Sequence, residues 1–153
     1  MILSIGCFEV AGSGLYCYKL AEMKTLHVKK GENIIEEGKL SDCAYIIESG
    51  KVEVSKSGPE GKRRIISVLG DGDIVGEMGL IDGLPRSATV TALEDCTISV
   101  LSPEVFNSLA QHNPQALMPI LKVLSTRLRA TLKLVDDIQA GNVDKKSPIE
   151  DSI

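Results

Sequence analysis

The sequence predicts a mainly β protein, an antiparallel jelly-roll-like β-roll or barrel flanked by C-terminal α-helices (an α+β chain). Short β-rich runs separated by turn residues extend from Thr25 to Leu101, and a Ser-Pro helix start follows at residue 102. Beyond it, an apolar stripe with helical spacing reaches Val135. Many short strands at close spacing are typical of a sandwich or barrel and not of a parallel α/β sheet.

Eight runs make up the expected β-roll over residues 25–101. They are TLHVKK, GENII, CAYIIES, KVEVS, RRIISVL, DIV, ATVTA and CTISVL, separated by turn sequences such as SGPEGK, GDGD and LEDC. A chain of 153 residues suffices for one such domain with its own core.

Two helical stretches are expected over residues 102–139. Ser102 is a good N-cap and Pro103 suits the first helical position. Pro114 opens the second stretch, where apolar residues recur every three or four positions: Leu117, Leu121, Leu124, Leu128, Leu132 and Val135. This stripe either packs on the barrel or pairs with a second copy of the chain.

The main domain is expected to span residues 15–140, between an unassigned segment, 1–14, and a polar tail, 141–153. Apolar residues from Leu15 to Met23 have near-helical spacing, which suggests a short helix. Only a short tail follows Gln139, so we expect either a free-standing domain or the excised domain of a larger protein.

Charge and composition argue against several classes of partner. The net charge is −4 and the pI about 5.2, so direct nucleic-acid binding is not expected. No apolar stretch is long enough for a membrane span, and no basic segment precedes the apolar start, so we expect a cytoplasmic protein without membrane contact. The cysteines Cys7, Cys17, Cys43 and Cys96 lack ligand-like spacing and are expected to be reduced.

The stretch GEMGLIDGLPRSATV, residues 76–90, has the chemistry of a phosphate site. Gly76 and Gly79 permit close approach of a ligand to the main chain, and GEMGLID can form one helical turn whose amides favour an anion. Arg86 offers a planar cationic fork for a phosphate, and Glu77 is an acceptor suited to a sugar hydroxyl. The alternative is an ordinary surface ion pair between Glu77 and Arg86.

This stretch resembles the phosphate-binding cassette of cyclic nucleotide-binding domains. GEMGL (76–80) and PRSATV (85–90) match that cassette without a gap, and the resemblance extends over about residues 25–137, including the glycine-containing corner at 49–54. The resemblance implies that Arg86 pairs with the cyclic phosphate and that Glu77 accepts from the ribose 2′-OH. It places the other ligand contacts at Gly76, Met78, Gly79, Leu80, Ser87, Ala88, Val68 and Leu69, with the C-terminal helix over the base.

The departures from the family pattern bear on the ligand. Val75 stands where an aromatic residue is often found, and Ser87 stands where cyclic AMP binders usually have Ala or Ser and cyclic GMP binders tend to have Thr. The expected ligand is therefore cyclic AMP, with cyclic GMP as the alternative and no further cofactor. Thr131, Arg127 and Arg129 are the candidates for reading the base.

Competing functions have weaker support in the sequence. A metal-dependent barrel enzyme needs several converging ligands, and His27 and His112 are the only histidines, so neither a metal nor catalysis is expected. Lys62, Arg63 and Arg64 suit a solvated strand edge. We expect a regulatory sensor whose C-terminal helix closes over bound nucleotide, with a possible homodimer through that helix and a downstream protein or attached effector domain. The alternative is a nucleotide-independent dimerisation or interaction module.

Overall fold

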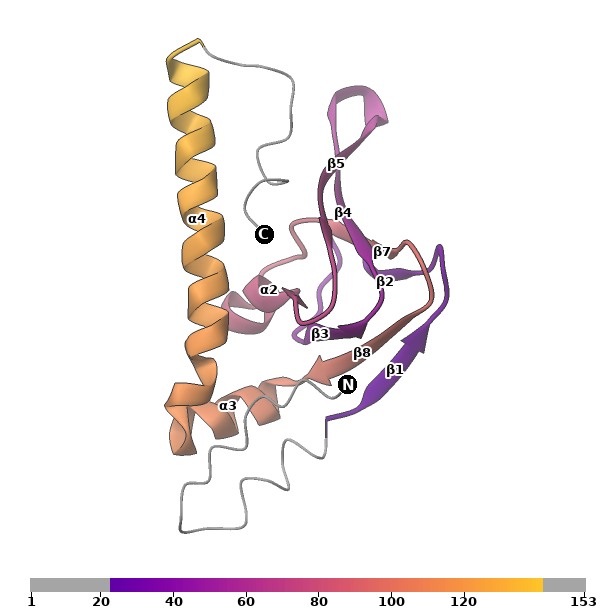
Figure 1. Cartoon of the computed structure of the whole chain (residues 1–153), viewed down its shortest axis with the longest axis vertical. Helices are drawn as coiled ribbons and strands as arrows, with labels where there is room; N and C mark the ends of the chain where they lie inside the picture. The colour runs from indigo at the N-terminus through magenta and orange to yellow at the C-terminus, as the bar shows by residue number, and fades with distance from the viewer. Residues whose placement is uncertain (1–22, 142–153) are drawn as a thin grey trace.

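A computed structural model describes residues 23–141, which form two four-stranded antiparallel sheets followed by helices (Figure 1). One sheet has the order β1-β8-β3-β6 and the other the order β2-β7-β4-β5. The strands are β1 (Thr25–Val28), β2 (Asn33–Ile35), β3 (Ala44–Ser49), β4 (Val52–Ser57), β5 (Arg63–Leu69), β6 (Ile74–Val75), β7 (Thr89–Ala92) and β8 (Cys96–Leu101). The helices are α2 (Glu77–Asp82), α3 (Pro103–His112) and α4 (Met118–Gln139), with 3-10 turns at Pro59–Gly61 and Pro114–Leu117.

The predicted fold class is confirmed, with one correction to its geometry. Each of the eight β-rich runs contains a strand, Ser102 precedes α3, and Pro114 opens the 3-10 turn that leads into α4. The sheets do not close into a barrel, because the edge strands β1 and β6 of one sheet do not pair with β2 and β5 of the other. The predicted helix at 15–23 and the residues Cys7 and Cys17 lie outside the described part of the chain, apart from Met23.

Apolar side chains from both sheets form the main core. Alternation along the strands directs one face of each sheet inward, as in other two-layer β folds. The buried members are Ile35, Ile47, Val52, Val75, Val90, Ala92, Cys96 and Ile98. The core includes β6, so it reaches the strand that leads directly into the predicted phosphate cassette.

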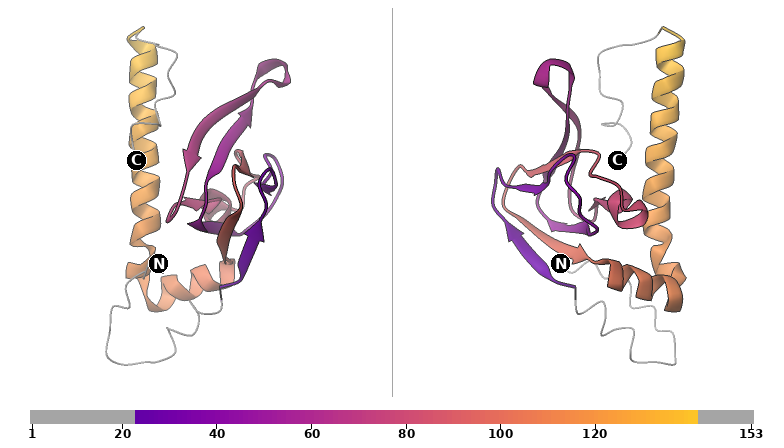
Figure 2. Two further views of the ribbon diagram at one scale, coloured as in Figure 1. Left: turned by 45° about the vertical axis from the view of Figure 1, so that its right-hand side comes forward. Right: turned by 180° about the vertical axis from the view of Figure 1, so that it is seen from behind.

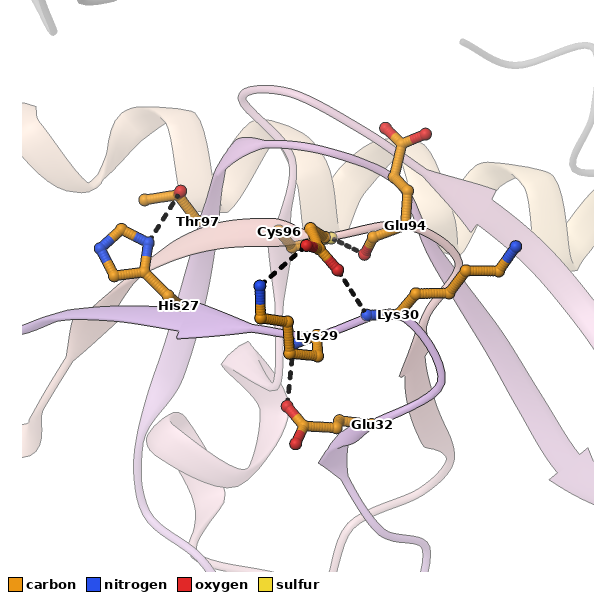
Figure 3. A network of polar contacts seen from close by, with 8 residues as sticks. His27, Lys29, Lys30, Glu32, Glu94, Cys96 and Thr97 are labelled. Atoms are coloured by element: carbon orange, nitrogen blue, oxygen red, sulfur yellow. Dashed lines mark hydrogen bonds and ion pairs between the residues drawn. The ribbon is translucent and has the colours of Figure 1, made fainter.

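A polar network fixes the corner between β1 and β8 (Figure 3). Lys29 Nζ and the backbone N–H of Lys30 donate to the two carboxylate oxygens of Asp95, each at 3.0 Å. The N–H of Lys30, followed by Lys29, holds the pKa of Asp95 below its ordinary value of 3.8. His27 Nδ1 lies 3.3 Å from Thr97 Oγ1 on the adjacent strand, so His27 has a structural partner far from the cassette.

The helices pack against a second apolar cluster at one end of the roll. Its buried members are Ala44, Ile74, Leu101 and Ile120, and partly buried residues of α3 and α4 surround them. Ser102 caps α3 by accepting from the N–H of Val105, as predicted, and a hydrogen bond from Ser102 lowers the pKa of Glu104.

The long helix α4 stands beside the roll, with α2 next to it and the β4–β5 hairpin extending alongside (Figures 1 and 2). The predicted leucine stripe divides between two environments. Leu117 and Leu124 pack against the second cluster, which confirms packing on the roll for these two residues. The other four, Leu121, Leu128, Leu132 and Val135, are exposed, and their pairing with a second copy stays a prediction. No helix between residues 23 and 141 is long and apolar enough to cross a membrane.

Candidate functional site

Arg86 is buried at the centre of the predicted cassette, with only 5% of its surface exposed. Its Nη1 donates to the carbonyl of Gly76 at 2.8 Å, and its Nη2 donates to Ser41 Oγ at 2.8 Å and to the carbonyl of Cys43. The face of the Tyr45 ring lies nearby, with its centroid 6.0 Å from Arg86 Cζ. The guanidinium thereby joins the start of α2 to the segment that precedes β3.

The positive charge of Arg86 has no carboxylate partner among the described residues. Its Nε is also buried without a hydrogen-bond partner. A buried guanidinium held only by neutral acceptors is costly unless an anion completes its environment. The orphaned Nε donor therefore fits a site for an anionic group.

A cavity of about 770 Å³ lies against Arg86. Residues of β4, β5, α2, the segment 84–88 and α4 line it. Its volume is within the range of about 300–1,000 Å³ that small-molecule sites usually have. Among the predicted ligand residues, the lining includes Leu69, Gly76, Glu77, Met78, Gly79, Arg86, Ser87 and Ala88.

Two predicted ligand residues are not part of the cavity lining. Val68 lies between Ser67 and Leu69 on β5; these two line the cavity, so alternation turns Val68 to the other face, where it is 40% exposed. Leu80 lies on α2 but packs against the second apolar cluster, because the helical turn directs it toward β6 and α4.

Two cassette glycines lie tightly against Arg86. Gly76 has φ +78°, and a Cβ there would lie 2.7 Å from Arg86 Nη1. A Cβ on Gly79 would lie 3.0 Å from the same nitrogen and 3.0 Å from the carbonyl of Ser41. The glycines thus let the guanidinium lie directly against the backbone of α2.

Glu77 is almost fully buried, with 3% exposure, and pairs with α4 instead of Arg86. Arg127 Nη1 lies 2.5 Å from Glu77 Oε1, and Arg127 Nη2 donates to the carbonyl of Ile74 at 2.8 Å. The alternative of a surface pair between Glu77 and Arg86 is therefore wrong. The pairing also gives Arg127 a role other than reading a base.

The remaining base-reading candidates occupy different places on α4. Thr131 lines the cavity, and its hydroxyl donates to the carbonyl of Arg127 at 2.9 Å. Arg129 is exposed and does not contribute to the lining. Ser87, from the cassette, is exposed at the cavity, with its hydroxyl 4.0 Å from Met78 Sδ.

Several contacts at this site could not be predicted from the sequence alone. Ser41 and Cys43 meet Arg86 across 45 and 43 positions of chain. Arg127 meets Glu77 across 50 positions. Burial and the neighbouring Asp42 raise the pKa of the Cys43 thiol, so the side chain next to this site is held in its neutral form. Two lysines that were not predicted also line the cavity, Lys56 from β4 and Lys122 from α4.

Comparison with known proteins identifies the same region. A family model for the cyclic nucleotide-binding domain matches residues 25–113. The chain is 26% identical over 117 residues to the CRP-like cAMP-activated global transcriptional regulator of Mycobacterium tuberculosis, covering 76% of this chain and 52% of the relative. It is 36% identical over 106 residues to the cAMP-activated global transcriptional regulator CRP of Salmonella typhimurium, covering 69% of this chain and 50% of the relative.

A solved structure agrees with these relatives. The catabolite activator protein of Thermus thermophilus superposes with a TM-score of 0.76 and 27% identity, over 86% of this chain and 62% of that one. The chain spans about half the length of the two curated regulators named above. Because the family model covers more than half of the sequence and includes every part of the cassette around Arg86, the chain belongs to the cyclic nucleotide-binding domain family.

Proposed function

We propose that this chain is a non-catalytic sensor that binds cyclic AMP and reports the bound state through α4. The observation that carries the proposal is the buried Arg86, which lines a cavity of about 770 Å³ and whose Nε has no hydrogen-bond partner. A small monoanion with an apolar ring system is the class of ligand that suits one buried cation in such a cavity.

The phosphate would bind at Arg86. The guanidinium would donate to a phosphate oxygen, with Nε as the donor that has no partner in the protein, and the glycines hold the guanidinium close to the start of α2. Ser87 and Ala88 line the same part of the cavity, with the Ser87 hydroxyl as a further donor. Together these groups replace the hydration that a phosphate loses on entering the cavity.

The ribose would bind at Glu77. Arg127 occupies Oε1 of this carboxylate, which leaves Oε2 to accept a hydrogen bond from the 2′-OH. The ion pair with Arg127 balances the charge of Glu77 in its buried position and fixes its orientation. A nucleotide lacking the 2′-OH would therefore leave Oε2 of Glu77 without a hydrogen-bond donor.

The base would lie between the β4–β5 hairpin and α4. Val54 and Leu69 line one side of this region, and Val123 and Ala130 line the other. These residues provide apolar contact without distinguishing adenine from guanine, so specificity depends on polar groups such as Thr131. The relatives named as cAMP-activated regulators and the Ser at position 87 favour cyclic AMP, with cyclic GMP as the alternative.

The output would be a change in the position of α4. This helix contributes Val123, Arg127 and Ala130 to the cavity, so a bound base would contact it directly. Besides Met118 at its start, α4 exposes five large apolar residues: Leu121, Leu128, Leu132, Val135 and Ile138. We propose that these residues pair with a second copy of the chain, and that nucleotide binding changes how the two helices are presented to a downstream protein or domain.

The exposed face also supports a second candidate function. A module that dimerises through α4 without any nucleotide would use the same five apolar residues. It would not require the unpaired donor of Arg86 or the glycines packed against it. Those features favour the sensor.

Calorimetric titration of the chain with cyclic AMP, cyclic GMP and 5′-AMP tests the proposal. We expect binding of cyclic AMP, weaker binding of cyclic GMP and a large loss for Arg86→Ala, about 30-fold or more, since the substitution removes one partner of a desolvated ion pair. Arg129→Ala is the matched control, because Arg129 is exposed and outside the cavity, and it should bind like the parent. The absence of heat at millimolar cyclic nucleotide would refute the sensor, and concentration-dependent sedimentation of that same protein would then support the nucleotide-independent module.

A further inference from the structure

Arg86 lies between two cavities of unequal size. It lines the cavity of about 770 Å³ described above and also a smaller one of about 150 Å³. The smaller cavity includes Lys39, Leu40, Ser41 and Tyr45, and none of these four lines the larger one. The guanidinium therefore contacts the ligand cavity with one part of its surface and the β2–β3 connection with another.

The nitrogen atoms of the Arg86 guanidinium differ in how many of their hydrogens have an acceptor. An arginine side chain has five N–H groups. Both hydrogens of Nη2 are engaged, one with Ser41 Oγ and one with the carbonyl of Cys43. One hydrogen of Nη1 goes to the carbonyl of Gly76, and the buried Nε has no partner.

This distribution matters because Nε and Nη2 share one edge of the planar group. A phosphate that binds this edge in the bidentate manner needs one hydrogen from each nitrogen. Nε has no partner in the protein, but Nη2 has no hydrogen to give while it binds both Ser41 and Cys43. A bidentate ligand must therefore displace one of these two acceptors.

Of the two acceptors, the Ser41 hydroxyl is the one that a ligand can displace from Nη2. The carbonyl of Cys43 belongs to the backbone directly before β3, whereas Ser41 is an exposed residue whose hydroxyl can rotate. The loop itself stays attached without the Ser41 hydroxyl, because Gly38 N donates to Arg86 O at 2.8 Å and Arg86 N donates to Lys39 O at 2.9 Å. Loss of the hydroxyl contact thus requires no unfolding of the loop.

We propose that Ser41 is a positioning residue that sets nucleotide affinity by competing with the ligand phosphate for Nη2 of Arg86. The inference rests on the proposed function, since it assumes that Arg86 binds a phosphate. It predicts opposite effects from two substitutions. Ser41→Ala removes the competitor, so the ligand binds more tightly while the ligand-free protein loses a hydrogen bond. Ser41→Asp replaces a neutral competitor with an anionic one, so the ligand binds more weakly while the ligand-free protein gains an ion pair at Arg86.

The test measures two quantities for each variant: the dissociation constant for cyclic AMP by calorimetry, and the melting temperature without ligand. For Ser41→Ala we expect binding about threefold to tenfold tighter and a lower melting temperature, the scale of one hydrogen bond. For Ser41→Asp we expect binding at least about tenfold weaker and a higher melting temperature. Leu40→Asp is the matched control: it adds the same charge one residue away on a side chain that is 75% exposed, and its affinity should stay within about twofold of the parent.

Changing a residue that merely supports the fold would lower both the affinity and the melting temperature, so a rise in one with a fall in the other is the signature of competition. Weaker binding by Ser41→Ala would overturn the inference, as would a Ser41→Asp protein that behaves like Leu40→Asp. Should Ser41→Asp fail to fold, the sign of the Ser41→Ala effect decides. If the parent binds and Arg86→Ala does not, but the Ser41 variants match the parent, this inference alone fails. If the parent binds no cyclic nucleotide, the proposed function fails and this inference with it.

Discussion

The ion pair between Arg127 and Glu77 should stabilise the attachment of α4 to the rest of the domain. Arg127 lies 2.5 Å from Glu77 Oε1 and donates to the carbonyl of Ile74 at 2.8 Å, so a single side chain joins α4 to α2 and β6. The Glu77 side chain is 4% exposed and the Arg127 side chain 37%. Replacing Arg127 with Met keeps most of its apolar stem and removes only the guanidinium.

The size of the effect follows from this unequal burial. Removing one partner of a fully buried ion pair costs about 3–5 kcal/mol, since the other charge is left unpaired. Arg127 is more than one third exposed, so water screens part of the interaction and we reduce the estimate for Arg127→Met to about 2–3 kcal/mol. Glu77→Gln leaves a partly exposed cation that water can solvate, so we expect a loss of only about 1 kcal/mol.

Urea unfolding of the parent, both single variants and the double variant measures the coupling. The double variant should be less destabilised than the sum of the single variants by about 1–2 kcal/mol, because the neutral amide that replaces the Glu77 carboxylate no longer needs a cation. Arg129→Met, two residues along the same helix and exposed, should change the unfolding free energy by less than about 0.5 kcal/mol. Additive single effects, within about 0.5 kcal/mol, would refute the claim that the two side chains stabilise each other.

Three further changes have expected outcomes. Gly76→Ala should lower the thermal stability by more than Gly83→Ala: both positions have positive φ, but only at Gly76 would the new Cβ lie 2.7 Å from Arg86 Nη1, whereas Gly83 has open space. Asp95→Asn should lower stability in urea unfolding at pH 7. Because the folded pKa of Asp95 is below its ordinary 3.8, its stabilising effect is present above that pH and disappears as the pH falls through the folded pKa, so parent and variant should converge in acid. Leu132→Glu should shift sedimentation velocity toward the monomer, since it puts a charge in the exposed apolar face of α4.

The strands and the cassette could be predicted from the sequence because their signals are local. Each β-rich run is bounded by Gly, Pro or Asp within a few residues, and the Ser102-Pro103 pair marks a helix start without reference to any distant residue. The closeness of Arg86 to its glycine neighbours could also be anticipated, because the spacing from Gly76 to Arg86 lies within one short segment. Features that depend only on residues within about a dozen positions of one another could therefore be predicted.

Features that depend on tertiary geometry could not be predicted from the sequence. On β5 the run RRIISVL has apolar residues at 65, 66, 68 and 69, so alternation alone does not show which face lines the cavity. In the structure Ser67 pairs with Val54 and Ile65 with Ser55, so Ile66 is an extra residue in β5 that interrupts the alternation, and Leu69, but not Val68, lines the cavity. Sequence periodicity carries no information about such a shift.

The helix α4 contributes both to the cavity proposed for the nucleotide and to an exposed apolar face. Val123, Arg127 and Ala130 line the cavity, and Leu128 and Leu132 on the same turns are exposed. If a second copy covers those leucines, any rotation of α4 caused by a nucleotide changes both surfaces together. Linkage then requires reciprocity: the factor by which cyclic AMP changes the dimerisation constant must equal the factor by which dimerisation changes the affinity for cyclic AMP. Under the proposed function, Arg127 would link the two equilibria through its bond to Glu77, because the carboxylate proposed for the ribose is the same group that contacts the helix.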